Sequence, residues 1–143
     1  MSEIVGIEQW LQETLLADSG VGGVATLVAN RIYADEAPQG AVYPFVLISA
    51  QAPGIDVVSV GPHRVMVNTL YWIRVVGNTA SKKALQATYD RLDTLLQAAG
   101  GLTSYLRVLM VNREQQLATP PATVNGVRYS QLGGLYRAFV QAP

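Results

Sequence analysis

The sequence has no cysteine and only one histidine among its 143 residues. The lack of cysteine excludes disulfides, thiolate nucleophiles and zinc sites built on sulfur, and it is typical of a chain that folds in a reducing compartment. The histidine, His63, lies between Pro62 and Arg64, and we interpret it as an exposed turn residue before a strand. Neither Ser59 nor Ser130 stands in a pattern that would complete a catalytic triad with it.

Charge is scarce and balanced in this chain. Charged residues make up 14% of the sequence, well below the usual share of about a quarter. Ten basic and ten acidic residues leave no net charge. Proteins whose main function is to grip nucleic acid usually carry a basic excess that displaces counterions. The balance therefore disfavours dedicated nucleic-acid binding.

Long apolar runs and signal-peptide features are also missing. Asn68 and Arg74 interrupt the longest apolar run, Val65–Val76, which therefore falls short of the roughly 20 residues of a bilayer span. The first residues carry acids where a signal peptide carries basic side chains. We expect no membrane association and no secretion, and the length predicts a single domain over residues 1–143.

No group of residues has the spacing of a catalytic, metal or cofactor site. The glycines of Gly20–Gly23 are not followed by the Gly-Lys-Ser/Thr of a phosphate-binding loop. Asp90 and Asp93 lie on a predicted helix, away from its leucine stripe, which predicts a solvated face rather than an acid–base pair. Asp35 and Glu36 lack the ligand spacing of a calcium loop. The sequence therefore predicts a protein that is not an enzyme and has no cofactor.

Two long helices and one short helix are predicted. The first begins after Ser2 as its N-cap and ends at Asp18. A short helix is predicted at Val24–Ala29, and the second long helix at Ser81–Ala98, stopped by Gly100-Gly101. The predicted buried stripes are Ile4, Ile7, Leu11 and Leu15 in the first helix and Ala84, Leu85, Thr88, Leu92, Leu95 and Leu96 in the second. The residues predicted to face away from the first stripe are Glu8, Gln12 and Glu13.

Four main strands are predicted, at Phe45–Ala50, Val65–Val76, Tyr105–Val111 and Val127–Val140. The second would span roughly 40 Å, about twice a usual strand, so it must bend or project beyond the body of the domain. The glycine pair Gly133-Gly134 predicts a bulge or bend in the last strand.

Two long loops are predicted between these strands. The first, Pro53–Arg64, could contain a short edge strand at Val57-Val58. The second, Arg113–Gly126, is marked by Pro120-Pro121 and Asn125-Gly126. Long loops in compact domains are usually functional or disordered, so both are candidate contact regions.

The element order predicts an α+β fold with a mostly antiparallel sheet of four to five strands and two main helices packed on one face. The strand Val65–Val76 is apolar on both sides: Val67, Tyr71 and Ile73 alternate with Met66, Leu70 and Trp72. Two helices can cover only one of these faces. Leaving the other in water would forgo about 1.5–3 kcal/mol for each large side chain. We therefore expect identical copies to cover it.

The segment Asn30–Ser49 carries a recognisable pattern. It contains Arg31-Ile32-Tyr33, then Ala37-Pro38-x-Gly40-Ala41-x-Tyr43-Pro44-Phe45, and the chain continues to a long strand that ends near Trp72 and Gly77. A second helix and a closing strand with Tyr129, Gly133-Gly134 and Tyr136 follow. In order and spacing the chain resembles the tail-completion or tail-terminator proteins of long-tailed bacteriophages.

This resemblance implies a structural virion protein of the tail neck, assembled in the host cytoplasm. It implies a ring, typically of six subunits, that closes the tail tube and faces the head–tail connector or stopper protein, while DNA passes through the lumen without specific binding. The candidate subunit-interface residues are Met66, Leu70, Trp72, Arg74, Tyr105, Tyr129 and Tyr136. The candidate residues for contact with the tube protein or connector are Ile55, Asp56, His63, Arg64, Arg113, Glu114 and Gln116.

Other interpretations stay open at this point. A head-completion or other neck protein would also form a ring without chemistry. Arginines interleaved with Tyr71, Trp72, Tyr105, Tyr129 and Tyr136 could form a platform for single-stranded nucleic acid. A small-ligand or enzymatic α+β domain has no candidate site. Added salt distinguishes nucleic-acid binding from ring formation, because nucleic-acid binding weakens steeply with salt whereas an apolar ring persists.

Overall fold

The computed structural model describes residues 2–51, 54–58, 60–61 and 63–141. Pro53, Ser59 and Pro62 of the first predicted loop lie outside these residues. The helices are α1 (Glu3–Ala17), α2 (Val24–Leu27), a 3-10 turn η1 (Lys82–Leu85) and α3 (Gln86–Leu96). The strands are β1 (Ile32–Ala34), β2 (Phe45–Ala50), β3 (Ile55–Val58), β4 (Arg64–Gly77), β5 (Gly101–Leu102), β6 (Arg107–Val124) and β7 (Val127–Gln141).

The strands of the described chain form one curled sheet in the order β1-β2-β4-β7-β6-β5, and β3 is paired with β4 beside β2. All pairings are antiparallel except that of β1 with β2. The α+β class is confirmed, but with seven strands the sheet is larger than predicted. One additional strand, β3, contains the short edge strand expected at Val57-Val58. The other two, β1 and β5, are only three and two residues long, too short for a periodic pattern to reveal.

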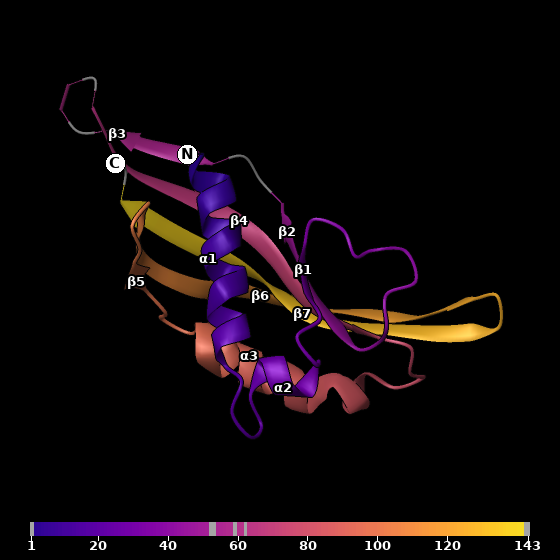
Figure 1. The fold of residues 1–143 in the computed structure, drawn as a ribbon. Coiled ribbons are helices and arrows are strands. Elements are labelled where there is room, and N and C mark those ends of the chain that lie inside the picture. The colour runs from indigo at the N-terminus through magenta and orange to yellow at the C-terminus, as the bar shows by residue number, and fades with distance from the viewer. Residues whose placement is uncertain (1, 52–53, 59, 62, 142–143) are drawn as a thin grey trace.

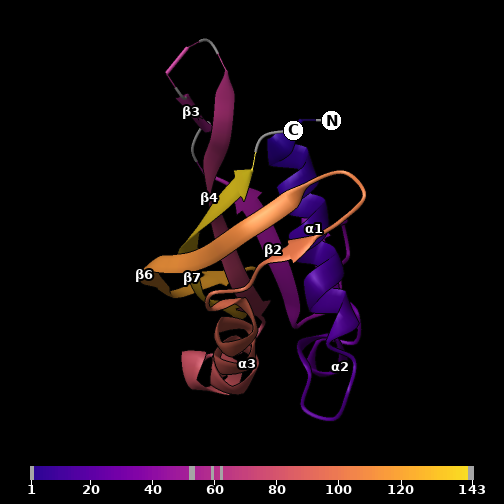
Figure 2. The same ribbon diagram turned by 90° about the vertical axis from the view of Figure 1, so that its left-hand side faces the viewer.

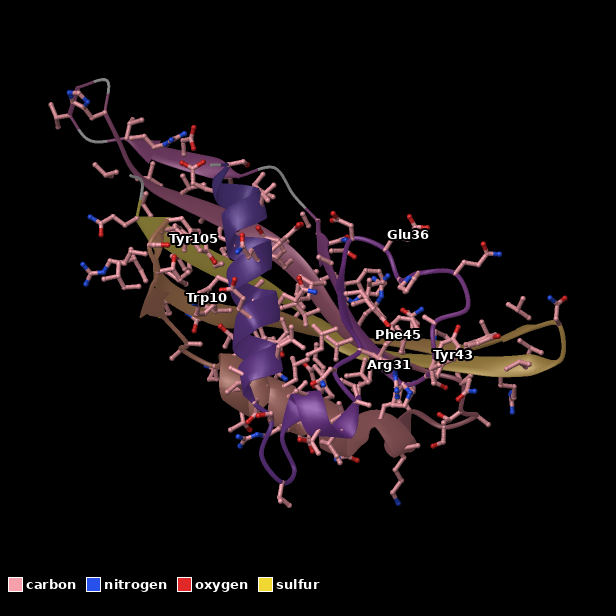
Figure 3. All side chains as sticks on the ribbon, viewed as in Figure 1. Trp10, Arg31, Glu36, Tyr43, Phe45 and Tyr105 are labelled. Atoms are coloured by element: carbon pink, nitrogen blue, oxygen red, sulfur yellow. The ribbon has the colours of Figure 1, made fainter. Side chains whose placement is uncertain are left out.

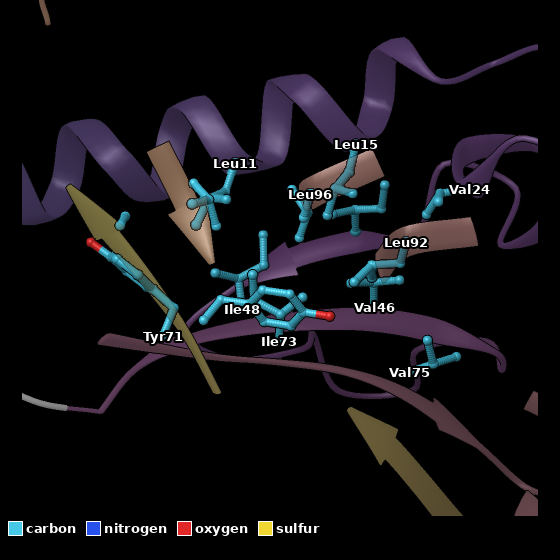
Figure 4. Close-up of a cluster of buried hydrophobic side chains, with 14 of the residues drawn as sticks. Leu11, Leu15, Val24, Val46, Ile48, Tyr71, Ile73, Val75, Leu92 and Leu96 are labelled. Atoms are coloured by element: carbon cyan, nitrogen blue, oxygen red, sulfur yellow. The ribbon is translucent and has the colours of Figure 1, made fainter. Parts of the chain in front are cut away.

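Helices α1 and α3 pack on the same face of the sheet (Figures 1 and 2). Their apolar stripes meet alternate residues of β2 and β4 in one core, seen in Figure 4 around Leu11, Leu15 and Leu92. Ile7, Leu11 and Leu15 are fully buried, as the spacing predicted. This face of the sheet is therefore covered within the chain.

Three helix predictions need correction. Glu8 was expected in water, but its side chain is buried on the flank of α1. The predicted Ser81–Ala98 helix is a 3-10 turn followed by α3, and within it Ala84 is exposed whereas Tyr89 is buried. The stripe was misassigned because residues of a 3-10 turn repeat every three positions rather than every 3.6.

The end of α3 also differs from the prediction. The helix stops at Leu96, and Ala98 rather than a glycine adopts a left-handed backbone, with φ of 56°. Ala98 N–H donates to Val111 O at 2.9 Å, and this bond ties the turn to β6. Gly101 instead begins β5. A Cβ added to Gly101 would lie only 3.2 Å from Trp10 Nε1.

The second predicted loop, Arg113–Gly126, is wrong. β6 continues to Val124 and pairs with β7 up to Val124–Val127, so only Asn125 and Gly126 form the turn. Both have positive φ, 51° and 79°, as a tight two-residue hairpin turn requires. Pro120-Pro121 was interpreted as a break, but it falls at a register shift between Thr119 and Ala122 where ladder donors are not needed.

The two hairpins end on opposite sides of the molecule. The tip of β6–β7 extends beyond the body at one end, and β3 with the first residues of β4 lies at the other (Figure 1). β4 pairs with β7 from Met66 to Gly77. Most of this long strand therefore follows the curl of the sheet, and only its start extends past the helices (Figure 2).

Gly133 and Gly134 permit close backbone approach in the middle of β7. A Cβ on Gly133 would lie 2.4 Å from Ile73 O and 2.6 Å from the Cβ of Arg74. The extra residues that produce register shifts are on β6, one of them between Arg113 and Gln115 opposite this region. The predicted irregularity therefore involves both strands. β7 contributes the glycines that allow close approach, and β6 contributes the inserted residue.

Candidate functional site

The second face of the sheet is covered by neither α1 nor α3. Along β4 the buried residues that point to the helices alternate with half-buried residues on the opposite side. Directly paired residues share a face, so those of β7 extend this surface. We define the outer sheet face as Met66, Leu70, Trp72 and Arg74 of β4 with Gln131, Leu135, Arg137 and Phe139 of β7.

One end of this side of the sheet is covered by the chain itself. Phe45, Leu47 and Val76 form a second, smaller apolar cluster, and residues of the segment 33–43 pack on it. The Tyr33 ring lies edge-on to Phe45, with centroids 5.7 Å apart. Tyr43 packs on Phe45 at 5.1 Å (Figure 3). This covering segment contains the pattern Ala37–Phe45 that carries the family resemblance.

Arg31 holds the covering segment in place. Its Nε donates to Pro44 O at 3.0 Å and its terminal nitrogen to Tyr43 O at 3.3 Å. Tyr43 also contacts Tyr129 of the β6–β7 hairpin, with centroids 5.4 Å apart. A hollow of about 730 Å³ lies between the segment and the hairpin tip at Asn125. The segment is therefore a fixed cover rather than a free loop.

The uncovered part carries an arginine without an anion. The guanidinium carbon of Arg74 lies 3.7 Å from the ring centroid of Trp72, and its buried Nε has no hydrogen-bond acceptor among the described residues. Burial lowers the pKa of Arg74 below its ordinary value. Trp72 Nε1 and Gln131 Oε1 are likewise buried without a hydrogen-bond partner. Arg137, by contrast, pairs with Glu114 and donates to Asn68 Oδ1 at 2.7 Å.

The structure brings together four of the candidate interface residues, Met66, Leu70, Trp72 and Arg74. The other three, all tyrosines, lie elsewhere. Tyr105 lies beside α1, where its hydroxyl donates to Glu13 at 3.2 Å, and Tyr129 packs on the covering segment. Tyr136 was wrongly included, because it is fully buried in the core and its side chain cannot reach a neighbour.

The candidate contact residues divide between the two ends of the sheet. Ile55, Asp56, His63 and Arg64 lie on or beside the β3–β4 hairpin, where Arg64 pairs with Glu3 of α1 at 2.7 Å. The other three, Arg113, Glu114 and Gln116, are exposed strand residues of β6 rather than loop residues.

Arg113 belongs to a polar cluster between α3 and the sheet. Its terminal nitrogen donates to Tyr89 Oη at 3.2 Å and lies 3.3 Å from Asp93. The Tyr136 hydroxyl donates to Asp93 at 2.7 Å, and burial raises the pKa of Tyr136 above its ordinary value. Asp93 was expected on a solvated face beside Asp90, but it points to the sheet. The cluster joins α3 to the sheet through the hydroxyl groups of Tyr89 and Tyr136.

The nucleic-acid platform is not assembled in this structure. Two of its aromatic residues, Tyr71 and Tyr136, are fully buried on the helix side of the sheet. Arg74 and Arg137 lie on the opposite face from Arg113. Stacking requires exposed aromatic rings beside the cations. The alternation of sheet residues therefore separates groups that the linear sequence places side by side.

The serine and acidic groups form no alternative site. The Ser130 hydroxyl is buried and donates to Thr79 O at 2.8 Å. Among the described residues there is no group of three or more histidines, aspartates or glutamates that could hold a metal ion. None of the helices in those ranges is long and apolar enough to span a bilayer.

Comparison with known proteins finds similarity at the level of structure alone. No family model and no curated protein matches the chain. A chain of the virion of a native gene transfer agent particle has a similar structure, with a TM-score of 0.67 at 18% identity and 92% of each chain covered. A second solved chain, described without a function, has a TM-score of 0.59 at 14% identity and covers all of this chain and 98% of its own. At these identities the likeness establishes a shared fold.

Proposed function

We propose that this protein is a structural virion component that forms a ring at the tail neck, closes the tail tube and joins it to the head connector. The observation that carries the proposal is the outer sheet face. It presents Leu70, Trp72, Leu135 and Phe139 half-buried and leaves them without cover from the helices. The resemblance of the sequence to tail-completion proteins supports this role, and so does the shared fold with a virion chain of a gene transfer agent.

The mechanism is assembly by surface complementarity. In the proposed ring, the outer sheet face of one copy meets a different surface of the next copy, because a ring is built from such head-to-tail contacts. One ring surface caps the tube and stops its growth, while the other meets the connector or stopper protein. The lack of net charge suits a lumen through which DNA slides.

The two hairpin ends are the proposed contacts with the tube protein or connector. The β3–β4 end exposes Ile55 and Val58, and the β6–β7 tip exposes Val124 and Val127, which are paired across the turn. Exposed aliphatic side chains at the ends of projecting hairpins are available to partners above and below a ring.

Purified protein tests the assembly step. We expect closed rings in negative-stain images and a single oligomer mass in mass photometry at micromolar concentration. The oligomer should persist from low to high salt, since apolar contact rather than charge holds it together. A chain that stays monomeric under all these conditions contradicts the proposal.

A particle-producing strain tests the position of the ring. Loss of the gene should leave filled heads separate from tails of irregular length, because nothing would stop tube growth. Heads that leak DNA beside tails of normal length would instead indicate a head-completion protein. Replacing Val124 and Val127 by serine should leave rings intact and reduce head–tail joining.

A further inference from the structure

We infer that Arg74 is the anchor of the contact between copies and that it receives a carboxylate from a second copy of this chain. The inference rests on the proposed assembly of identical subunits and adds the chemistry of its central contact. Three observations support it: which arginines have polar partners, the position of Arg74 on the outer sheet face, and the carboxyl groups that have no partner within the described residues.

Arg74 differs from three other arginines of the described chain, each of which contacts a carbonyl or carboxylate group. Arg31 donates to two carbonyl groups, Arg113 contacts Asp93, and Arg137 pairs with Glu114. Within the described residues, the Arg74 guanidinium has only the Trp72 ring as a partner, and its buried Nε lacks a hydrogen-bond acceptor. A buried donor without an acceptor costs about 1–3 kcal/mol, and more when the group is charged. Such a group is expected where another molecule completes the site.

The surroundings of Arg74 favour a carboxylate. Across the strand pair it faces Gly133, and the two strands approach so closely there that a Cβ on Gly133 would lie 2.6 Å from the Cβ of Arg74. The planar guanidinium stacked on Trp72 offers its edge to a bidentate anion, which is the geometry arginine shares with carboxylates.

The same chain carries the complementary charge. The carboxyl groups of Glu36 and Asp90 are exposed, and neither takes part in a hydrogen bond or ion pair within the described residues. Glu36 lies in the covering segment (Figure 3), and Asp90 lies on the outer side of α3. A chain with equal numbers of acidic and basic groups can therefore neutralise Arg74 in a neighbour without a foreign partner.

A zero-length cross-link tests the contact directly. Lys82 and Lys83 are the only lysines of the chain, so Arg74→Lys places one new amine on the outer sheet face. Carbodiimide treatment of a mixture of light and isotopically labelled Arg74→Lys protein should yield a peptide in which this amine is joined to a carboxylate of the other isotope. Loss of that peptide on adding Glu36→Gln or Asp90→Asn identifies the carboxylate.

A second variant measures the contribution to assembly. Arg74→Met keeps the apolar stem and removes the charge, and it should raise the concentration of half-assembly at least about tenfold. Arg128→Met is the matched control, because it removes an exposed arginine of the β6–β7 hairpin and should leave assembly unchanged.

The two ideas fail in different ways. Normal oligomer formation by Arg74→Met, together with no isotope-mixed cross-link in Arg74→Lys, overturns the role of Arg74 and leaves the ring intact. A wild-type chain that never associates overturns the ring as well.

Discussion

At the scale of single residues, the least expected feature is a carboxyl group inside the helix–sheet interface. Glu8 lies on α1 with 8% of its surface exposed. Its helical position beside polar Gln9 and Gln12 predicted a solvated side chain. That prediction was wrong because a helix pattern assigns faces only approximately. Burial, together with the nearby Asp35 carboxyl, raises the pKa of Glu8 from 4.5 to about 7. A structural glutamate therefore titrates near neutral pH.

Stability should consequently depend on pH between about 4.5 and 7. The folded chain retains a proton on Glu8 that the unfolded chain has already released in this range, so the free energy of unfolding falls as the pH rises and levels off above the folded pKa. The loss amounts to at most about 3 kcal/mol. Urea unfolding across this range should show the slope in wild type and lose it in Glu8→Gln. Glu13→Gln, on the exposed side of α1, should keep it; equal slopes in both variants would exclude Glu8 as the source.

The Tyr136 hydroxyl is a second residue whose role follows from burial. Tyr136→Phe removes its hydrogen bond to Asp93 and its contact with Tyr89 Oη at 3.1 Å, so the free energy of unfolding should fall by about 1–3 kcal/mol. Chemical denaturation measures the change. Tyr105→Phe removes a comparable bond to Glu13 at the surface and should change stability by less than about 0.5 kcal/mol. Similar losses in the two variants would contradict this ranking.

At the scale of elements, the β4–β7–β6 ribbon organises the molecule. β7 pairs with β4 on one side and with β6 on the other along almost its whole length. Gly133 and Gly134 near its centre allow the neighbouring strands to approach closely, because any side chain there would meet backbone atoms. The glycines were recognisable in the sequence. The crowding around them could not be predicted, because it depends on which strands pair with β7.

Gly133→Ala should therefore be strongly destabilising. The new Cβ would lie 2.4 Å from Ile73 O, and rigid backbone cannot yield as a flexible side chain does, so we expect a loss of about 3 kcal/mol or more, or failure to fold. Circular dichroism with urea unfolding measures the effect. Gly20→Ala, where no atom lies within 4 Å of the new Cβ, should have little effect. A stable, well-folded Gly133→Ala protein would show that the strands are less closely spaced than described.

At the scale of the whole molecule, the two faces of the sheet differ in how far the chain covers them. One is filled by α1 and α3, whereas the other is covered only at one end, by the segment that Arg31 holds. The remaining apolar surface, with its unpaired arginine, is the basis of the proposed ring. A subunit that leaves such a surface in water would forgo about 25 cal/mol for each Å² of apolar area.

A charge on this face should separate assembly from folding. Leu70→Glu places a carboxylate among the apolar residues of the outer sheet face, and we expect a folded monomer, because Leu70 is only half-buried within the subunit. Sedimentation measures the oligomer and circular dichroism the fold. Val5→Glu, on the exposed side of α1, is the matched control and should leave the oligomer intact. If both variants assemble like wild type, the outer sheet face is not the contact surface.

Local sequence was sufficient to locate most elements. The apolar run Phe45–Ala50 is β2 with the predicted bounds, and the stripe of α1 buries Ile7, Leu11 and Leu15 as expected. These features follow from periodicity, because a helix or strand buries residues at fixed spacings whatever it packs against. The sequence also indicated that the sheet is apolar on both faces.

Only the tertiary structure decided what lies on each face. Pro120-Pro121 reads locally as a break, yet pairing with β7 carries β6 past it to Val124. The burial of Glu8 and Tyr136, the cover over Phe45 and the isolation of Arg74 depend on segments far apart in the sequence. Strand register and long-range packing set these relations, and neither is encoded by the spacing of residues within one element.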